Sequence, residues 1–504
     1  MSTQRESWSA RSGFILAAIG SAVGLGNIWR FPYVSYENGG GAFFIPYLVA
    51  LASAGFPLLF LDYVAGQKYH GAPPTAYRRM IKSKEIVGWW QVLVCTVIGI
   101  YYASVLSWAG QYMLYAFEQK WGDDPQTFFF EHYLQNGSGL DFGIVPKLFI
   151  GVAIVWILVL FIMYGGIRKG VELANKICIP LLIVMFTIMV VQAVQLNGAS
   201  TGLNAFFTPN WEKMADPKVW LAAYGHVFFS MSIGFGIMVT YSSYLKKNAN
   251  LTGSGLVVGF ANSSFEIMAG IGIFSVLGFM AVQSGVPVSE VVSSGIGLAF
   301  IAFPKIISTM GDAGTLIGIL FFGSLFVAGV TSMASILQVP ISAVKDKFGW
   351  SHKKAVSTVG GVSALISLAL FSTKTAITFV DVIDHFANNI GVVTGAILSI
   401  IWVTWFNRPV MDKLISHINA ISSVKVGKGW VFMLTIITPI SLIVALGLSV
   451  FSLITKGYDS YDLATQLIFG WGVVAVFALG SFLLTKAPAH ATHHQHKSTE
   501  GENA

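Results

Sequence analysis

A glycine-rich stretch near the start of the chain is the first place where residue types and spacing suggest chemistry. It reads GSAVGLGN from Gly20 to Asn27, inside an apolar run of membrane-spanning length. Each glycine costs a helix up to about 1 kcal/mol relative to alanine. Within hydrocarbon, an unwound backbone is tolerated only where protein or a water-filled cavity satisfies its amides and carbonyls. By itself the stretch fits a broken helix and a close-packing motif of small residues equally well.

A second stretch repeats the pattern. Residues Ser230 to Gly236 read SMSIGFG, in the middle of another long apolar run. Paired interrupted helices in corresponding positions of two halves are typical of transporters built from inverted repeats. The N-termini of half-helices can hold an anionic group, and the freed carbonyls can ligate a small cation. The repetition favours the broken-helix interpretation.

Neutral oxygens lie near both breaks. Asn27, Ser230 and Asn262 offer them, and Thr331 with Ser332 offers two adjacent hydroxyls in a later apolar run. A single Ser or Thr in a membrane helix usually donates to a carbonyl of its own helix, one turn earlier. Because these polar residues recur in four separate apolar runs, we favour the interpretation that together they bind a cation.

The elements that must position these residues are membrane spans. The 504 residues are 55% hydrophobic and only 11% charged, with a mean hydropathy of +0.70, whereas soluble domains carry about 25% charged residues. We therefore predict an all-α polytopic membrane protein. Reading apolar stretches of roughly 20 residues as spans predicts twelve, near 12–35, 42–66, 88–117, 147–164, 172–194, 219–243, 254–281, 314–344, 355–371, 376–406, 430–454 and 466–485.

Lysine and arginine residues gather in alternate loops between these spans. Arg78 and Arg79 follow the second span, whereas the loop 118–146 after the third span is acidic. Basic loops stay in the cytoplasm, so we expect a multi-pass protein of the bacterial inner membrane with both termini cytoplasmic. This distribution also accounts for the net charge of +7, and we expect no nucleic-acid partner.

Few other side chains suggest metal binding or catalysis. Cys95 and Cys178 lie within or beside apolar runs without a paired framework, so we expect buried thiols. Four histidines between 490 and 496 could hold a metal, but no second element fixes their geometry and we expect a solvated tail. No nucleophile–base pair stands out, so we do not expect an enzyme.

The two glycine-rich stretches and their surroundings resemble the neurotransmitter:sodium symporter family, and in particular its prokaryotic branch, typified by the bacterial leucine transporter. The likeness runs from Arg5 to about Phe406, with two further spans after it. The most specific matches are GSAVGLGNIWRFPY at 20–33, ENGGGAFFIPY at 37–47, FFSMSIGFG at 228–236 and AGVTS at 328–332.

The resemblance implies a 5+5 inverted repeat with helices 1 and 6 broken, followed by two extra C-terminal helices. It also implies a functional unit of one chain, although the sequence leaves the oligomeric state open. The corresponding segments are a cytoplasmic N-terminal segment (1–11), a first repeat (12–194), an extracellular loop (195–218), a second repeat (219–406), two further spans (407–485) and a disordered cytoplasmic tail (486–504).

Two sodium sites are implied as well, each combining main-chain carbonyls with neutral side-chain oxygens. The first would be completed by a carboxylate of the substrate. Its protein ligands would be the Ala22 carbonyl, Asn27, Ser230 and Asn262. The ligands of the second would be the carbonyls of Gly20, Val23 and Ala328 and the hydroxyls of Thr331 and Ser332.

The implied substrate site adjoins the first sodium site. The substrate carboxylate would meet the amides of Leu25 and Gly26 and the hydroxyl of Tyr102. The remaining substrate-binding residues would be Ala22, Ile98, Phe229, Ser230, Ser232, Phe235, Ser332 and Ile336.

Gates on both sides of this site are implied by four charged residues. Arg30 and Asp384 match the extracellular ion pair, with Tyr102 and Phe229 as a lid. The cytoplasmic gate would consist of the pair Arg5 and Asp346, with Trp8, Ser243 and Tyr244 beside it. Gly170 and Pro180 match the fifth helix of relatives, where unwinding opens an inward water path; a proline kink is the alternative.

The residue at position 24 bears on the cargo. It is glycine, where monoamine transporters of the family place an aspartate, so a zwitterion that brings its own carboxylate is favoured. The apolar residues Ile98, Phe235 and Ile336 suggest a neutral aliphatic or aromatic amino acid. A betaine- or taurine-like osmolyte is the alternative within transporters, and a channel or a non-translocating sensor is the alternative class.

Glu266 is a carboxylate inside a predicted span, and such residues are functional candidates. Chloride-dependent relatives have serine there, so the resemblance implies that Glu266 supplies the negative charge and that chloride is not needed. Tyr47 matches a chloride ligand, but His226 stands where a glutamine is usual. A carboxylate satisfied by neighbouring hydroxyls, without a role in coupling, is the alternative.

Overall fold

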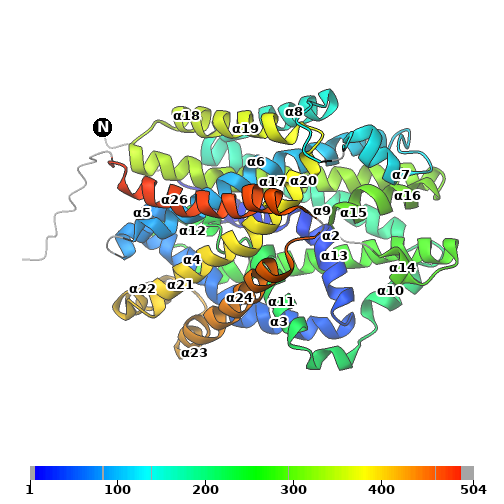
Figure 1. The fold of residues 1–504 in the computed structure, drawn as a ribbon. Helices are drawn as coiled ribbons and strands as arrows, with labels where there is room; N and C mark the ends of the chain where they lie inside the picture. Colours follow the sequence, from blue (N-terminus) through cyan, green and yellow to red (C-terminus); the bar gives the residue numbers. More distant parts are fainter. Residues whose placement is uncertain (1–5, 82–83, 138, 293–294, 460, 490–504) are drawn as a thin grey trace, which may run out of the picture.

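The computed structural model of the chain describes residues 6–81, 84–137, 139–292, 295–459 and 461–489. Within these ranges the regular structure is helical, apart from two isolated bridges, Gly40 with Pro209 and Ile144 with Thr373. Most of the long helices run along one common direction (Figure 1). The predicted all-α class is confirmed.

The first five spans lie within residues 11–193. The first is a pair of helices bent by 54°, and the other four are long apolar helices. In chain order they are α1 (Arg11–Ala22) with α2 (Leu25–Glu37); η1 (Gly41–Phe43), α3 (Phe44–Ala50), η2 (Leu51–Gly55) and α4 (Phe56–Tyr69); α6 (Glu85–Tyr115); α8 (Pro146–Tyr164); and η4 (Ile167–Glu172) with α9 (Leu173–Ala193).

The next five spans lie within residues 217–404, and the first of them is again interrupted. They are α11 (Pro217–Ser230) with α12 (Ile237–Ser242); α13 (Leu251–Ser284); α17 (Asp312–Phe348); α18 (His352–Ala355), η7 (Val356–Gly360) and α19 (Gly361–Phe371); and α20 (Ala376–Phe386), η8 (Ala387–Val392) and α21 (Val393–Thr404).

Two further spans complete the chain. They are α23 (Lys428–Phe432), η9 (Met433–Ile437) and α24 (Thr438–Lys456), followed by α25 (Leu463–Thr465), η10 (Gln466–Trp471) and α26 (Gly472–Lys486). Ten helices of the described residues are long and apolar enough to span a membrane, and the bent pair makes an eleventh. With α11 and α12 as one interrupted passage, the predicted twelve spans are confirmed.

Short helices lie at the two ends of the bundle. The end that carries the first described residues, called here the N-terminal face, also holds α5 (Pro73–Met80), α22 (Arg408–Ile421) and the end of α26 (Figure 1). At the opposite face lie α7 (Pro125–Thr127), α10 (Ala199–Phe207), α14 (Val288–Val291) and α16 (Phe303–Ser308) (Figure 1). Next to them along the chain are η3 (Phe128–Tyr133), η5 (Trp211–Ala215), α15 (Gly295–Gly297) and η6 (Leu298–Ala302).

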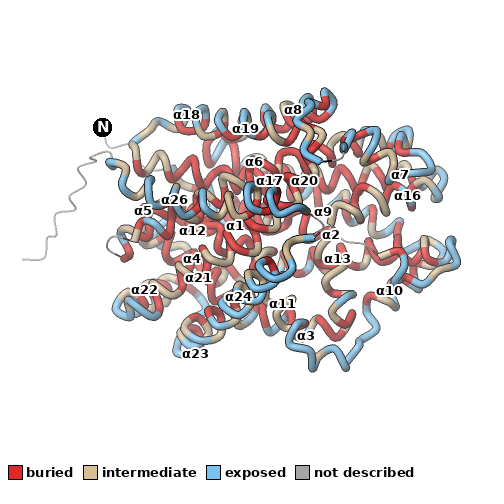
Figure 2. Tube along the Cα trace, in the orientation of Figure 1, coloured by how far each residue is buried: buried red, intermediate tan, exposed pale blue. Residues whose placement is uncertain are grey.

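Burial separates central from peripheral helices (Figure 2). In the most apolar window of α6 and of α13, 72% of the residues are buried, but only 17% in the last span. The peripheral helices expose large apolar side chains such as Phe161 and Ile454, as lipid contact requires. Cys95 is buried as expected, whereas Cys178 is only half-buried because one side of the peripheral helix α9 is exposed.

Local sequence explains where the central helix α13 begins and ends. Asn250 caps its start, since the side-chain oxygen accepts a hydrogen bond from the Gly253 N–H at 2.9 Å. The helix ends at Gly285, whose φ of +67° suits a residue without a side chain. The 34 residues between them place Asn262 and Glu266 near the middle of the span.

Candidate binding site at the two helix breaks

The first break frees main-chain groups of α1 and α2. The N–H of Gly24, which would close the next helical turn onto the Gly20 carbonyl, donates instead to Asn27 Oδ1 at 2.8 Å. The last carbonyls of α1 and the first amides of α2, including those of Leu25 and Gly26, therefore lack partners within their helices. The break thus presents carbonyl oxygens and N–H groups at one place.

The second break is held in an unusual backbone conformation. Between α11 and α12, Ser232, Gly234 and Gly236 have φ of +53°, +84° and +75°. This left-handed region suits glycine but strains a serine. The Ser232 hydroxyl donates to the Ser21 carbonyl at 2.9 Å, so the strained residue joins the two breaks directly.

A cavity of about 780 Å³ lies beside both breaks. Its lining comes from α1, α2, α6, α17 and the break after α11, and it extends toward the opposite face. Every residue that the sequence suggested for substrate binding lines this cavity: Ala22, Leu25, Gly26, Ile98, Tyr102, Phe229, Ser230, Ser232, Phe235, Ser332 and Ile336.

Gly24 and Gly26 face different surroundings. A Cβ atom at Gly26 would lie 2.5 Å from Cε1 of Phe229, so that ring occupies the space of a side chain. A Cβ atom at Gly24 would lie at an ordinary distance of 3.5 Å from the Ser332 hydroxyl and 3.6 Å from the Tyr102 hydroxyl. A side chain could therefore be accommodated at position 24, and the glycine there leaves this part of the cavity free of charge.

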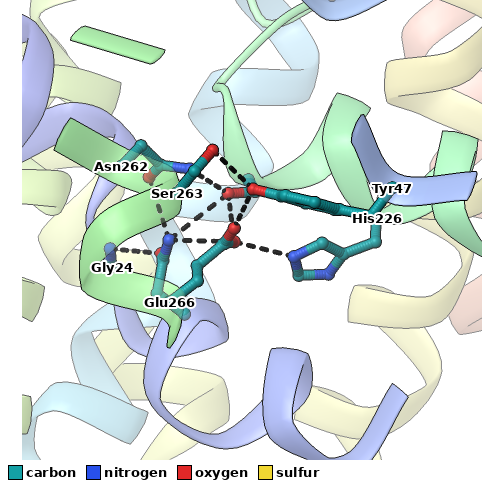
Figure 3. A network of polar contacts seen from close by, with 8 residues as sticks. Gly24, Tyr47, His226, Asn262, Ser263 and Glu266 are labelled. Atoms are coloured by element: carbon teal, nitrogen blue, oxygen red, sulfur yellow. Dashed lines mark hydrogen bonds and ion pairs between the residues drawn. The ribbon is translucent and has the colours of Figure 1, made fainter. Parts of the chain in front are cut away.

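The three polar side chains suggested for the first sodium site come together around Asn262, which Figure 3 labels. Asn27 Nδ2 donates to Asn262 Oδ1 at 2.9 Å, and Asn262 Nδ2 donates to Ser230 Oγ at 2.5 Å. All three are buried. The Ala22 carbonyl belongs to the unpaired end of α1. These neutral oxygens are a donor set that suits a small hard cation.

Glu266 joins this cluster to the region around His226 (Figure 3). The carboxylate is fully buried and accepts hydrogen bonds from Tyr47 Oη and Ser230 Oγ, both at 2.5 Å, and from Asn27 Nδ2 at 3.2 Å. His226 Nε2 lies 2.7 Å from the same carboxylate. Glu266 therefore contacts two of the residues suggested for sodium.

The residues suggested for the second sodium site lie on α1 and α17, which pack against each other. Gly20 and Val23 are at the end of α1, where Val23 has left helical geometry. On α17, the Thr331 hydroxyl donates to the Ala328 carbonyl at 2.9 Å. Ser332 follows at the cavity wall.

The suggested outer gate is not closed by an ion pair. Both Arg30 and Asp384 line the cavity, but among the described residues no ion pair with nitrogen and oxygen within 4.0 Å joins these two side chains. Asp384 Oδ1 instead accepts hydrogen bonds from Tyr101 Oη at 2.6 Å and from Asn388 Nδ2 at 2.8 Å. Arg30 lies over the ring of Phe229.

At the N-terminal face, Arg5 lies outside the described residues, as do the histidines of the tail. Trp8 is buried and its indole N–H donates to the Tyr241 carbonyl at 2.9 Å. Asp346 Oδ2 accepts a hydrogen bond from the Ala72 N–H at 2.7 Å.

The neighbours suggested for this gate lie around α12. The N–H of Trp8 donates to the Tyr244 carbonyl, and the hydroxyls of Tyr244 and Ser342 are 2.8 Å apart. Ser243 is buried and donates to the Thr240 carbonyl.

Gly170 and Pro180 belong to the same helical span. Gly170 lies in η4 and Pro180 inside α9, where the proline ring removes one helical hydrogen bond. The helix continues through Pro180.

Several cavity residues were missed by sequence reasoning. Asp381 and His385 flank Asp384 at helical spacing, a signal that could have been used. Tyr458 and Tyr461 come from the loop before α25, and both donate to Asp381, at 2.8 and 2.9 Å. Nothing in their local sequence indicates this contact.

Comparisons with known proteins agree with this arrangement. A model of the sodium:neurotransmitter symporter family matches residues 5–131 and 122–495. An uncharacterised sodium-dependent transporter of Methanocaldococcus jannaschii is 39% identical over 485 residues, 96% of this chain and 98% of the relative. The sodium- and chloride-dependent taurine transporter of Rattus norvegicus is 29% identical, over 93% of this chain and 82% of its own.

A solved structure is also similar. The crystal structure of MhsT in complex with L-phenylalanine superposes with a TM-score of 0.74 and 31% sequence identity. The match covers 88% of this chain and all of the other.

Proposed function

Because this chain belongs to the sodium:neurotransmitter symporter family and is a sodium-dependent symporter, we propose that it imports a neutral amino acid with a hydrophobic side chain, aliphatic or aromatic. The observation that carries the proposal is the cavity at the two breaks. It combines the first N–H groups of α2, which have no partner within the helix, with a group of neutral oxygens and an apolar wall. The MhsT structure, which holds L-phenylalanine, supports the substrate class.

The substrate carboxylate binds at the start of α2. There the amides of Leu25 and Gly26 have no partner within the helix, the Leu25 N–H donates to the Tyr102 hydroxyl, and the positive end of the helix dipole favours an anion. Tyr102 adds a hydroxyl from α6. The side chain of the substrate extends toward Ile98 and Phe235, where burying apolar surface contributes about 25 cal/mol per Å².

Sodium at the first site couples to the substrate. Asn27, Ser230 and Asn262 supply side-chain oxygens, the Ala22 carbonyl supplies another, and the substrate carboxylate completes the shell. Because ion and substrate touch, each raises the affinity of the other by the same factor. The second site, with Gly20, Val23, Ala328, Thr331 and Ser332, holds α1 against α17 and shares Ser332 with the substrate pocket.

Transport proceeds by alternating access. The Lys- and Arg-rich loops support a cytoplasmic position for the N-terminal face and for both termini. Closure on the extracellular side moves Arg30 and Phe229 over the substrate and brings Arg30 to Asp384. Opening on the cytoplasmic side releases Trp8 from α12.

Transport is independent of chloride. Glu266 is fully buried against the first sodium site and contributes a fixed negative charge there. A buried charge persists only when paired or well hydrogen-bonded, and the surrounding hydroxyl, amide and imidazole groups meet this need.

One screen tests the proposal and its alternative. Purified protein is heated with each of the twenty amino acids, taurine and betaine, with sodium or with potassium. We expect the largest sodium-dependent stabilisation from a hydrophobic amino acid. The taurine transporter among the relatives makes an osmolyte the second candidate, and stabilisation by taurine or betaine alone would select it.

Uptake into proteoliposomes then separates a symporter from other classes. We expect accumulation of the selected compound above its external concentration only when a sodium gradient is imposed. Dissipative flux would indicate a channel, and saturable binding without accumulation would indicate a sensor. Either result would contradict the proposal.

A further inference from the structure

Asn175 on α9 carries a buried amide oxygen for which the fold supplies no partner. The residue is fully buried, and its Oδ1 has no hydrogen-bond donor among the described residues. Its Nδ2 donates to the Val171 carbonyl at 2.8 Å, which fixes the orientation of the amide, because the flipped amide would set two oxygens against each other. An unpaired buried carbonyl costs free energy, so its position calls for an explanation.

This oxygen points at Gly20. A Cβ atom at Gly20 would lie 1.9 Å from Asn175 Oδ1 and 2.9 Å from Cδ1 of Ile179. The missing side chain of Gly20 therefore admits the amide oxygen against the α1 backbone. Gly20 is also the residue whose carbonyl is freed by the break and assigned to the second sodium site.

A carboxylate lies one helical turn closer to the N-terminal face. Glu172 is fully buried, and its Oε1 would lie 2.2 Å from a Cβ atom at Gly13. It accepts hydrogen bonds from the N–H of Ser9, at 2.9 Å, and from the Ser9 hydroxyl. Lys176 pairs with it at 2.7 Å and is itself 41% exposed. The carboxylate is thus connected to solvent through a lysine that a second cation could replace.

The two glycines of α1 form one pattern with two polar residues of the fifth span, Glu172 at the end of η4 and Asn175 in α9. Glu172 faces Gly13 and Asn175 faces Gly20, so η4 and α9 present oxygens to α1 at both positions where α1 has a glycine. If these contacts served packing alone, apolar side chains would fill the same space without leaving an oxygen unpaired. Amide and carboxylate oxygens are ligands that hard cations prefer.

We propose that Asn175 and Glu172 form a sodium exit relay between the second sodium site and the N-terminal face. The amide oxygen of Asn175 takes the ion as it leaves the Gly20 carbonyl. Glu172 then receives it, as Lys176 and Ser9 move off the carboxylate. The relay rests on the proposed sodium-coupled function and adds two residues to the path of the ion.

The equilibrium test uses sodium alone, so it does not depend on the identity of the substrate. Thermal unfolding of the purified full chain is followed while sodium replaces potassium at constant ionic strength. Asn175→Asp, nearly the same size, places a charge beside the ion and is expected to lower the sodium concentration for half-maximal stabilisation about threefold or more. Gln192→Leu, at an exposed position of α9, serves as the control and should leave this concentration unchanged.

The kinetic test follows release of radiolabelled sodium from the same proteins after dilution into potassium. We expect slower release from Asn175→Asp, because the ion is held more tightly at the relay. Asn175→Leu lacks the oxygen and is expected to slow sodium-driven uptake of the amino acid selected by the thermal screen about fivefold. The sodium concentration that gives half-maximal stabilisation of this variant should stay within about twofold of the wild-type value. Asn175→Ser keeps a hydroxyl oxygen and should retain part of the rate, which provides a second variant if the leucine protein does not fold.

Two failures can be told apart. If the wild-type protein is not stabilised by sodium, the proposed function fails and the relay with it. If the wild type responds but Asn175→Asp and Asn175→Ser match it in sodium affinity, release and uptake, Asn175 only packs against Gly20 and the relay alone is wrong. An increase in the sodium concentration required by Asn175→Asp would overturn the relay as well.

Discussion

The guanidinium carbon of Arg30 lies 4.8 Å from the centre of the Phe229 ring. The same ring fills the space that a side chain at Gly26 would need. The Phe229 ring therefore contacts both Arg30 and Gly26 of α2, while Asp384 accepts hydrogen bonds from Tyr101 and Asn388. To form the ion pair proposed for the closed gate, Arg30 must approach Asp384 from this position.

The contact between Arg30 and the Phe229 ring predicts how replacing Phe229 changes substrate dissociation. Phe229→Leu keeps an apolar side chain but removes the cation–π contact, worth about 0.5–2 kcal/mol. We expect the bound amino acid to dissociate about threefold to tenfold faster, measured with radiolabelled substrate after dilution. Unchanged dissociation would show that the ring does not retain the substrate.

Gly26→Ala tests the close contact with the ring directly. The new Cβ atom would lie 2.5 Å from Cε1 of Phe229, so the ring must move or α2 must shift. We expect substrate affinity to fall about tenfold or more, since overpacking costs about 1–3 kcal/mol.

Gly225→Ala is the matched control for this change. It lies in α11, where an added Cβ atom meets nothing within 4 Å. Binding should be unaffected, and the helix should gain up to about 1 kcal/mol from the better helix former. Equal losses of affinity in both variants would contradict the role given to the contact at Gly26.

Asn27→Ala tests the shared site of ion and carboxylate. The change removes one ligand oxygen and the bond that turns the Gly24 N–H away from Gly20. We expect the affinities for sodium and for substrate to weaken together, each by about tenfold, in paired titrations. A loss confined to one of them would disprove the shared site. Asn204→Ala, on the exposed surface of α10, should change neither.

Glu266→Ser should make transport depend on chloride. The fixed carboxylate is lost, and a hydroxyl beside Tyr47 and Ser263 leaves room for an anion. Uptake by this variant should be restored in chloride but not in gluconate. Uptake by Glu266→Gln should be impaired in either anion. Transport by the serine variant that ignores chloride would count against charge compensation.

A buried ion pair at the N-terminal face makes a prediction for stability. Lys347 Nζ lies 2.8 Å from Glu85 Oε1, and both side chains are more than nine-tenths buried. Glu85→Gln leaves the lysine charge uncompensated, so we expect a loss of about 3–5 kcal/mol, measured as a lowered melting temperature in detergent.

The exposed pair of Lys120 and Glu118 provides the comparison. Glu118→Gln should cost no more than about 1 kcal/mol, because solvent screens that pair. Similar shifts in melting temperature for the two variants would mean that burial does not increase the contribution of the Lys347–Glu85 pair to stability.

Much of the site could be predicted because its signals are local. Both breaks follow from helix propensity within a few residues, and the motifs around Gly20 and Ser230 identified the cavity lining. The outer wall could not be predicted in this way. Tyr458 reaches Asp381 across 77 positions of the chain, and no periodicity reports such a contact.

The sequence by itself determined the membrane spans, the places where two of them break and the family, because hydropathy and helix propensity act over short stretches. Only the tertiary structure decided which distant residues meet. It brought Glu266 of α13 to Asn27 and His226, and it set the unpaired oxygen of Asn175 against Gly20. Those contacts depend on how whole helices pack, and packing is decided by shape and burial across the entire bundle rather than by any single segment.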